Sequence, residues 1–142
     1  MAHFAKIDLN NDVVDCIVIH NDVATSEAAG QEFIANVLKK EGTWLQTSYN
    51  TVADVHRLGG TPLRGNFGTK GSTWDPVLEI FMPPKPFPSW VMSNSASKWT
   101  SPIGDRPSFT AEQESQNAAG THDWLYYWDE ENLSWELFNT LA

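Results

Sequence analysis

Residues 73–102 read TWDPVLEIFMPPKPFPSWVMSNSASKWTSP, and they hold six of the eight prolines and three of the seven tryptophans of the chain. The central segment, Met82–Trp90, cannot be helical. Proline fixes φ, has no N–H donor, and disfavours the helical conformation of the residue before it. We therefore expect a Pro-rich extended arm here, with polyproline II or edge-strand backbone.

Hairpin patterns lie on both sides of this arm and return near the end of the chain. Residues 74–81, 90–100 and 125–137 each place a turn of Asp, Asn, Pro, Glu or Ser residues between two short apolar segments. Each unit also carries aromatic residues that can pair across the strands, and such pairs stabilise a sheet by about 0.2–1 kcal/mol. The pattern predicts small aromatic hairpins that serve packing.

The rest of the chain predicts one more hairpin, one helix and two loops. An Asn- and Asp-rich turn joins the two alternating segments of the first hairpin, and a stripe of apolar residues marks the helix. Glycine and basic residues fill the first loop, whereas the second is polar with at most a helical turn from Thr110. In order, the segments are strands at 3–8 and 13–20, the helix at 27–40, a third strand at 43–49, and loops at 50–72 and 103–122.

These elements predict an α+β, mainly β protein. We expect a small antiparallel sheet of hairpins with one helix, plus the Pro-rich extended arm and the Gly-rich loop. The expected parts are a hairpin, helix and strand unit at 1–50, the Gly-rich loop at 51–72, and an aromatic hairpin region with the Pro-rich segment at 73–142. A length of 142 residues fits one domain overall.

Composition argues against several functional classes. The formal net charge of −9 opposes binding to nucleic acid, which needs a basic stripe, and favours a partner with a basic surface. No apolar run has membrane length and no leader precedes the first strand, so we expect a soluble protein without a membrane partner. The lone Cys16 cannot form an internal disulfide, which fits assembly in a reducing cytoplasm.

Motifs that could carry chemistry are incomplete. Asp8–Asp12 starts like a calcium-binding loop, but Val13 stands where glycine is needed and Ile19 where a bidentate glutamate is needed. The glycines at 65–71 lack the Gly-Lys-Ser/Thr of a phosphate loop. The carboxylates at 129–131 lie in a hairpin turn, where acidic residues are ordinary. We therefore expect no enzyme activity, no metal and no cofactor.

The aromatic side chains could form either a sugar-binding surface or the core of the protein. Exposed indole and phenol rings can stack on sugars, but the same rings can form the core of a protein with little helix. A platform requires at least two exposed, coplanar indoles, whereas a core requires buried ones. The candidates are Trp74, Trp90, Trp99, Trp124, Tyr126 and Trp128.

Three groups of segments together carry a resemblance to a known group of proteins. They are residues 3–8 with 13–19, residues 44–50 with 63–67, and Pro83–Trp90 with the closing 127–135. In that order they resemble small virion structural proteins of tailed phages, of the type found in cyanophages and marine phages. The resemblance covers most of the chain and is weakest at 66–73 and 103–124. It brings no catalytic residues with it.

The resemblance implies a non-enzymatic protein of the virion exterior, assembled in the host cytoplasm. We expect capsid decoration, in which a cement protein at high copy number binds neighbouring capsid subunits, with a homo-oligomer as an open possibility. A tail, baseplate or fibre-associated adaptor, or a carbohydrate-binding adhesion module that uses exposed tryptophans, is the alternative. The residues expected to contact capsid or tail proteins are Arg57, Arg64, Lys70, Pro84, Phe87 and Trp90.

Overall fold

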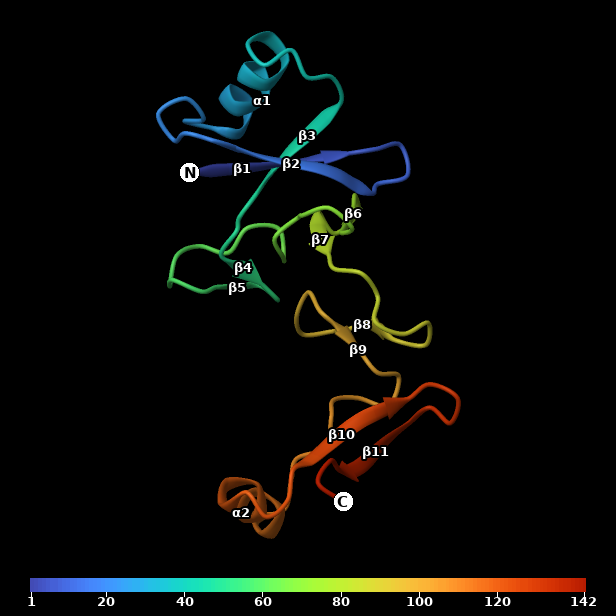
Figure 1. Ribbon diagram of the computed structural model, residues 1–142. Helices are drawn as coiled ribbons and strands as arrows, with labels where there is room; N and C mark the ends of the chain where they lie inside the picture. The colour runs from blue at the N-terminus through green and yellow to red at the C-terminus, as the bar shows by residue number, and fades with distance from the viewer. The chain divides into compact units, whose positions relative to one another are not determined.

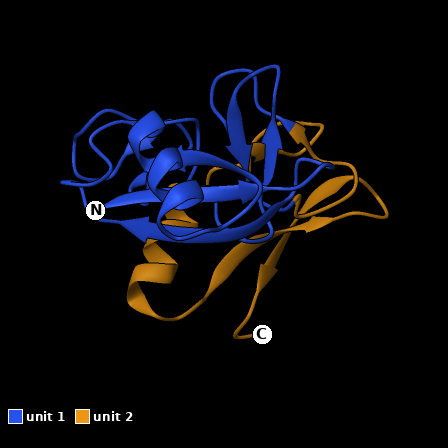
Figure 2. Ribbon diagram, turned by 90° about the horizontal axis from the view of Figure 1, so that it is seen from above, with its two compact units in different colours: residues 1–84, 92–98 blue, residues 85–91, 99–142 orange.

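A computed structural model describes all residues, 1–142, and they form two compact units (Figure 2). Unit 1 comprises Met1–Pro84 and Met92–Lys98, and unit 2 comprises Lys85–Val91 and Trp99–Ala142. The division therefore falls within the Pro-rich stretch and differs from the boundaries expected at residues 50 and 72. Strands hold 33% of the residues and helices 13%, which confirms the α+β, mainly β class. The expectation of a single helix is wrong, because there are two.

The main sheet of unit 1 has three antiparallel strands in the order β2-β1-β3 (Figure 1). The strands are β1 (Ala2–Ile7), β2 (Val13–Ile19) and β3 (Thr43–Thr47). The Asp8 carboxylate shapes the turn between β1 and β2, since its Oδ1 accepts the main-chain N–H groups of Asn10 at 2.8 Å and Asp12 at 2.9 Å. This confirms the predicted β-turn.

Helix α1 (Glu27–Asn36) begins at Ser26, whose hydroxyl accepts the N–H of Ala29 at 3.1 Å. It ends four residues earlier than expected. The N–H of Lys40 bonds to the carbonyl oxygen of Ile34 at 3.0 Å, and Lys39 takes a left-handed φ of 55°. The left-handed Lys39 reverses the chain and lies beyond the last helical turn, where we had expected a residue of the helix.

The core of unit 1 lies on both faces of β1, because successive strand residues point to opposite sides. On one face of β1, Ala2 and Phe4 form a cluster with Ile34 of α1, and the helix lies against this face (Figure 1). The other contains Ala5 and Ile7, packed with Phe81 and its neighbours. Phe4 and Phe81 are fully buried, and each ring lies directly against a glycine, Gly30 and Gly68 respectively.

Two short hairpins complete unit 1. Strands β6 (Thr73–Asp75) and β7 (Ile80–Met82) pair Trp74 with Phe81 at 4.8 Å between ring centroids, as predicted. Strands β4 (Thr51–Val52) and β5 (Val55–His56) lie within the segment expected to be a loop. Both residues of the β4–β5 turn have positive φ, a geometry that usually calls for Asn-Gly or Asp-Gly. The two turn residues are Ala53 and Asp54, a pair that does not predict this geometry.

Unit 2 contains a terminal hairpin and a second helix. Strands β10 (Trp124–Asp129) and β11 (Ser134–Asn139) pair Trp128 with Trp135, which confirms the predicted aromatic hairpin. Helix α2 (Ala111–Ala119) contradicts the loop expected at 103–122. A capping box of Thr110 and Gln113 starts it, and Gly120 ends it in left-handed conformation.

Two further strands, β8 (Val91–Met92) and β9 (Trp99–Thr100), lie where the chain passes from one unit to the other. The polar turn expected between them is present, and the N–H of Ser93 donates to the carbonyl oxygen of Lys98 at 2.8 Å. Neither α1 nor α2 is long and apolar enough to cross a membrane.

Candidate functional site

Arg57 and Lys70, two of the six residues expected to contact a partner, are exposed on unit 1. Arg57 donates from Nη2 to the carbonyl oxygen of Tyr49 at 3.1 Å, and its guanidinium lies 5.2 Å from the centre of the Tyr49 ring. These contacts orient Arg57 without covering it. Its role toward a partner, like that of Lys70, stays a prediction.

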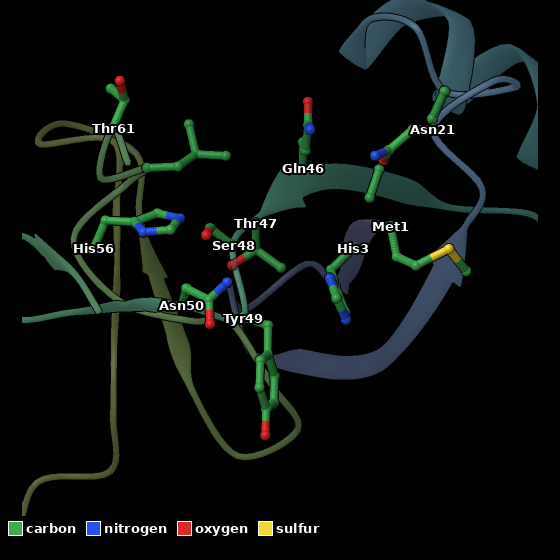
Figure 3. Close-up of a pocket in the computed structure, with 13 residues that line it drawn as sticks. Met1, His3, Asn21, Gln46, Thr47, Ser48, Tyr49, Asn50, His56 and Thr61 are labelled. Carbon is green, nitrogen blue, oxygen red and sulfur yellow. The ribbon is translucent and has the colours of Figure 1, made fainter. Parts of the chain in front are cut away.

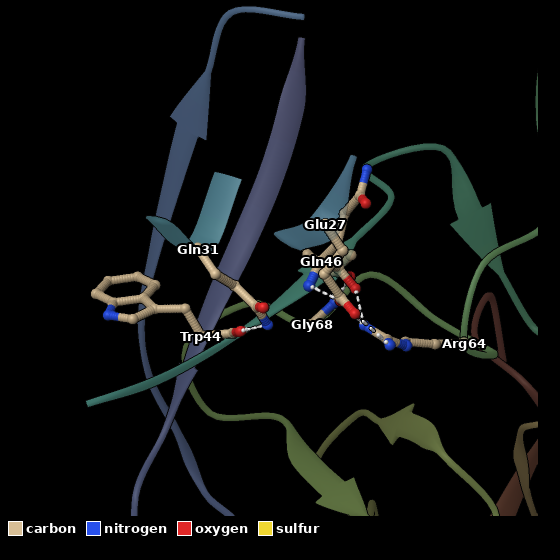
Figure 4. Close-up of polar contacts among 7 residues, drawn as sticks. Glu27, Gln31, Trp44, Gln46, Arg64 and Gly68 are labelled. Atoms are coloured by element: carbon tan, nitrogen blue, oxygen red, sulfur yellow. Dashed lines mark hydrogen bonds and ion pairs between the residues drawn. The ribbon is translucent and has the colours of Figure 1, made fainter. Parts of the chain in front are cut away.

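Arg64 is half-buried, and its guanidinium binds within unit 1 (Figure 4). It forms a two-pronged ion pair with the Glu27 carboxylate and donates to the carbonyl oxygen of Gln46 at 2.9 Å. Glu27 in turn accepts the N–H of Gln46 at 2.8 Å. Burial alone would raise the pKa of Glu27, but the hydrogen bonds from Arg64 and Gln46 outweigh it and lower that pKa. Arg64 therefore joins α1 to β3.

A second polar network holds the Gly-rich loop of unit 1 in place. The Asp54 carboxylate accepts both the N–H and the hydroxyl of Ser97, at 2.6 and 2.8 Å. The Asn66 side chain donates to the carbonyl oxygens of Phe81 and Ser97, at 2.8 and 2.7 Å, and is buried. Segments that are far apart in sequence are thus fixed to one another, which gives the loop a defined shape.

Phe87 and Trp90 pack within unit 2, whereas Pro84 is exposed at the end of a unit 1 segment. The two rings lie 5.5 Å apart, and Trp90 contacts Trp128 and Trp135 at 6.0 and 5.9 Å between centroids. The indole N–H of Trp90 is buried without a hydrogen-bond partner. The arm is thus anchored by its aromatic residues to the terminal hairpin.

Glu130 strengthens this anchor from the β10–β11 turn. Its carboxylate accepts the main-chain N–H of Ser89 at 2.9 Å, the Ser89 hydroxyl at 2.7 Å and the Trp128 indole N–H at 2.7 Å. The bond from Trp128, with smaller contributions from Ser89, lowers the pKa of Glu130. The carboxylate that the sequence placed in an ordinary turn therefore has a structural role.

None of the tryptophans is an exposed residue. Trp44 and Trp128 are buried, and the other five are half-buried. Trp124 is stacked on His122 with centroids 5.3 Å apart and planes at 12°. The two exposed indoles that a sugar-stacking platform requires are absent.

A polar cavity of about 450 Å³ lies in unit 1 (Figure 3). Its wall includes His3, Gln46 and His56, which come from three different strands. Burial lowers the pKa of His3, which keeps its ring neutral at pH 7. No group of three or more His, Cys, Asp or Glu side chains is arranged to hold a metal ion. This cavity was not predictable from the sequence, because its residues are scattered between positions 1 and 63.

An apolar strip on unit 2 was also not predicted from the sequence. Leu125, Tyr127 and Phe138 share the face of the β10–β11 hairpin that is opposite to Trp128 and Trp135, and we call them the Tyr127 face. Tyr127 is 48% exposed and Phe138 is 50% exposed. Because the run from Trp124 to Trp128 is apolar throughout, it carries no alternation that would show which face is open.

Comparisons of the chain with protein-family models, with curated proteins and with solved structures gave no match.

Proposed function

We propose that this chain is a non-enzymatic structural protein on the exterior of a tailed-phage particle, where it decorates the capsid by binding neighbouring capsid subunits. The resemblance of its segments to small virion structural proteins motivates the proposal. The structural observation that supports it is the Tyr127 face, which presents aromatic side chains on a braced hairpin.

The Tyr127 face has the chemistry of a protein-binding surface. Aromatic residues are enriched at the centres of interfaces, where they contribute large contact area with few rotatable bonds. Tyr127 and Phe138 are about half exposed and lie edge to face, with centroids 6.5 Å apart. The contacts of Glu130 with Ser89 and Trp128 hold β10, the strand that carries Tyr127, in place. A rigid surface of this kind loses little conformational freedom on binding.

Charge around this face indicates which partner would fit. Unit 2 contains eight Asp and Glu residues against only Lys85 and Arg106, so it carries six of the nine net negative charges of the chain. Glu136 lies on the Tyr127 face itself, opposite Tyr127 in the strand register. Complementary charge speeds association and selects partners, so the proposed capsid surface is basic around an apolar centre.

Co-sedimentation tests this proposal. The purified full chain is mixed with heads, and separately with tails, of particles that lack it. We expect the chain to sediment with heads, and to do so less at high salt because screening weakens charge attraction. Sedimentation with tails alone would replace capsid decoration with a tail-associated role. Sedimentation with neither fraction would contradict a structural role on the particle.

A further inference from the structure

Much of the wall of the polar cavity in unit 1 consists of amide and hydroxyl side chains, which can both donate and accept hydrogen bonds. No Asp, Glu, Lys or Arg side chain lines it. Its volume of about 450 Å³ lies within the range of about 300–1,000 Å³ that small-molecule sites span. The amides and hydroxyls on its wall come from Asn21, Gln46, Ser48, Asn50 and Thr61.

These five side chains form no hydrogen bond within the chain, although the backbone that carries several of them is fixed. The main-chain N–H and C=O of Gln46 bond to Glu27 and Arg64, and the carbonyl oxygen of Asn50 accepts the N–H of Arg57 at 2.8 Å. By contrast, the neighbouring Thr47 hydroxyl is engaged, because it accepts the N–H of Gly68 at 2.7 Å. The cavity therefore combines a rigid frame with hydrogen-bonding groups that have no partner in the protein.

His56 adds a hydrogen-bond donor to the cavity wall, and contacts with the main chain fix the orientation of its ring. Its Nδ1 accepts the main-chain N–H groups of Leu58 at 3.2 Å and Gly60 at 3.0 Å. In the neutral ring the proton must then be on Nε2. In Figure 3 the imidazole lies on the same side of the cavity as Thr61.

We propose that this cavity binds an uncharged, hydroxyl-rich ligand, a sugar of one or two rings. Each hydroxyl of a sugar both donates and accepts, and side-chain amides and hydroxyls do the same. A mainly apolar ligand would leave these polar groups unpaired. The only formal charge on the wall is the N-terminal ammonium of Met1, which lies close to His3. The site is independent of the Tyr127 face, so it would give the protein a glycan contact in addition to its structural role.

Titration of the isotope-labelled full chain, followed by nuclear magnetic resonance, tests the site. The probes are D-glucose, D-galactose and maltose, each raised to about 100 mM because affinities for single sugars are weak. We expect saturable shifts of the side-chain amide signals of Asn21, Gln46 and Asn50. Acetyl-trialanine amide serves as the peptide probe, since its main chain also both donates and accepts.

Two variants and one control assign the shifts to the cavity. Gln46→Met keeps the length of the side chain and removes the amide, and Thr61→Val keeps the shape and removes the hydroxyl. Each is expected to weaken sugar binding about fivefold, the value of one hydrogen bond. Asn36→Ala, on an exposed residue of α1 outside the cavity, should leave binding unchanged.

Two results would overturn the proposal. One is the absence of saturable shifts with all three sugars, or shifts that neither cavity variant weakens. The other is tighter binding of the peptide probe than of any sugar, which would make the cavity a peptide site. Because this titration uses the isolated chain, its outcome is independent of whether the chain binds phage heads.

Discussion

Replacing Gly30 with alanine sets two physical effects against each other, and the structure determines which is larger. Gly30 lies inside α1, where alanine is favoured over glycine by about 0.8–1.0 kcal/mol. An added Cβ would, however, lie 2.1 Å from Cζ of Phe4 and 2.7 and 2.9 Å from its two Cε atoms. Ordinary contact begins at 3.4 Å, and the Phe4 ring is fully buried.

The steric effect should be the larger one. Overpacking a core costs typically about 1–3 kcal/mol, and an overlap of this size against a buried ring corresponds to the upper end. After subtraction of the helix-propensity gain, we expect Gly30→Ala to lower the free energy of unfolding by about 2 kcal/mol. For a chain of this length the melting temperature would fall by about 4–8 °C.

Urea denaturation followed by circular dichroism measures this change. Glu32 is exposed on the same helix, so the difference between Glu32→Ala and Glu32→Gly gives the alanine preference without the steric term. Adding Phe4→Leu to Gly30→Ala removes the tip of the ring and should make the effect of the alanine smaller than in the wild-type background. If Gly30→Ala is as stable as the wild-type chain or more so, α1 does not lie against Phe4 and the packing described for unit 1 is wrong.

Three further variants test the polar contacts and the exposed face. The folded-state pKa of Glu27 is lowered, so its ion pair stabilises the fold fully above the ordinary carboxyl pKa, and this stabilisation is lost as the pH falls through the folded value. Glu27→Gln should therefore cost about 1 kcal/mol at pH 7 in urea denaturation, and the cost should shrink progressively as the pH falls below the ordinary glutamate pKa of about 4.3; a cost independent of pH would contradict this. Glu130→Ala should speed the exchange of amide hydrogens in the Pro-rich arm, because the N–H of Ser89 loses its acceptor. The neighbouring Glu131→Ala should leave this exchange unchanged. Equal exchange rates in the two variants would show that the Glu130 contacts do not brace the arm. Tyr127→Ser should leave the free energy of unfolding within about 0.5 kcal/mol of the wild-type value but weaken co-sedimentation with heads at least tenfold. The control Val77→Ser changes an exposed apolar residue of unit 1 and should alter neither quantity. Unchanged binding by Tyr127→Ser would show that the Tyr127 face does not bind the capsid.

The hairpins were predictable because their signals are local. Asp75-Pro76 fixes the turn that brings Trp74 to Phe81, and the polar turn after Trp128 brings that residue to Trp135. Helix α2 also has local signals, namely the capping box and Gly120, but none of its residues is buried. Without an apolar stripe, the periodicity that marks most helices is absent.

The polar contacts were not predictable, since they join residues that are distant in the chain. Arg64 and Glu27 are 37 residues apart, and only the packing of α1 on the sheet brings them together. The basic side chain of Arg64 was expected to face a partner, whereas it is held inside unit 1. Phe87 and Trp90 were also expected to contact a partner, and in the structure they pack against aromatic residues of unit 2.

Localisation of the chain on intact phage particles by electron cryomicroscopy tests the proposed function most directly. We predict density for both units repeated over the capsid lattice, with the Tyr127 face in contact with capsid subunits. Density confined to the tail or fibre bases would contradict capsid decoration, and the absence of the chain from the particle would contradict the structural role itself.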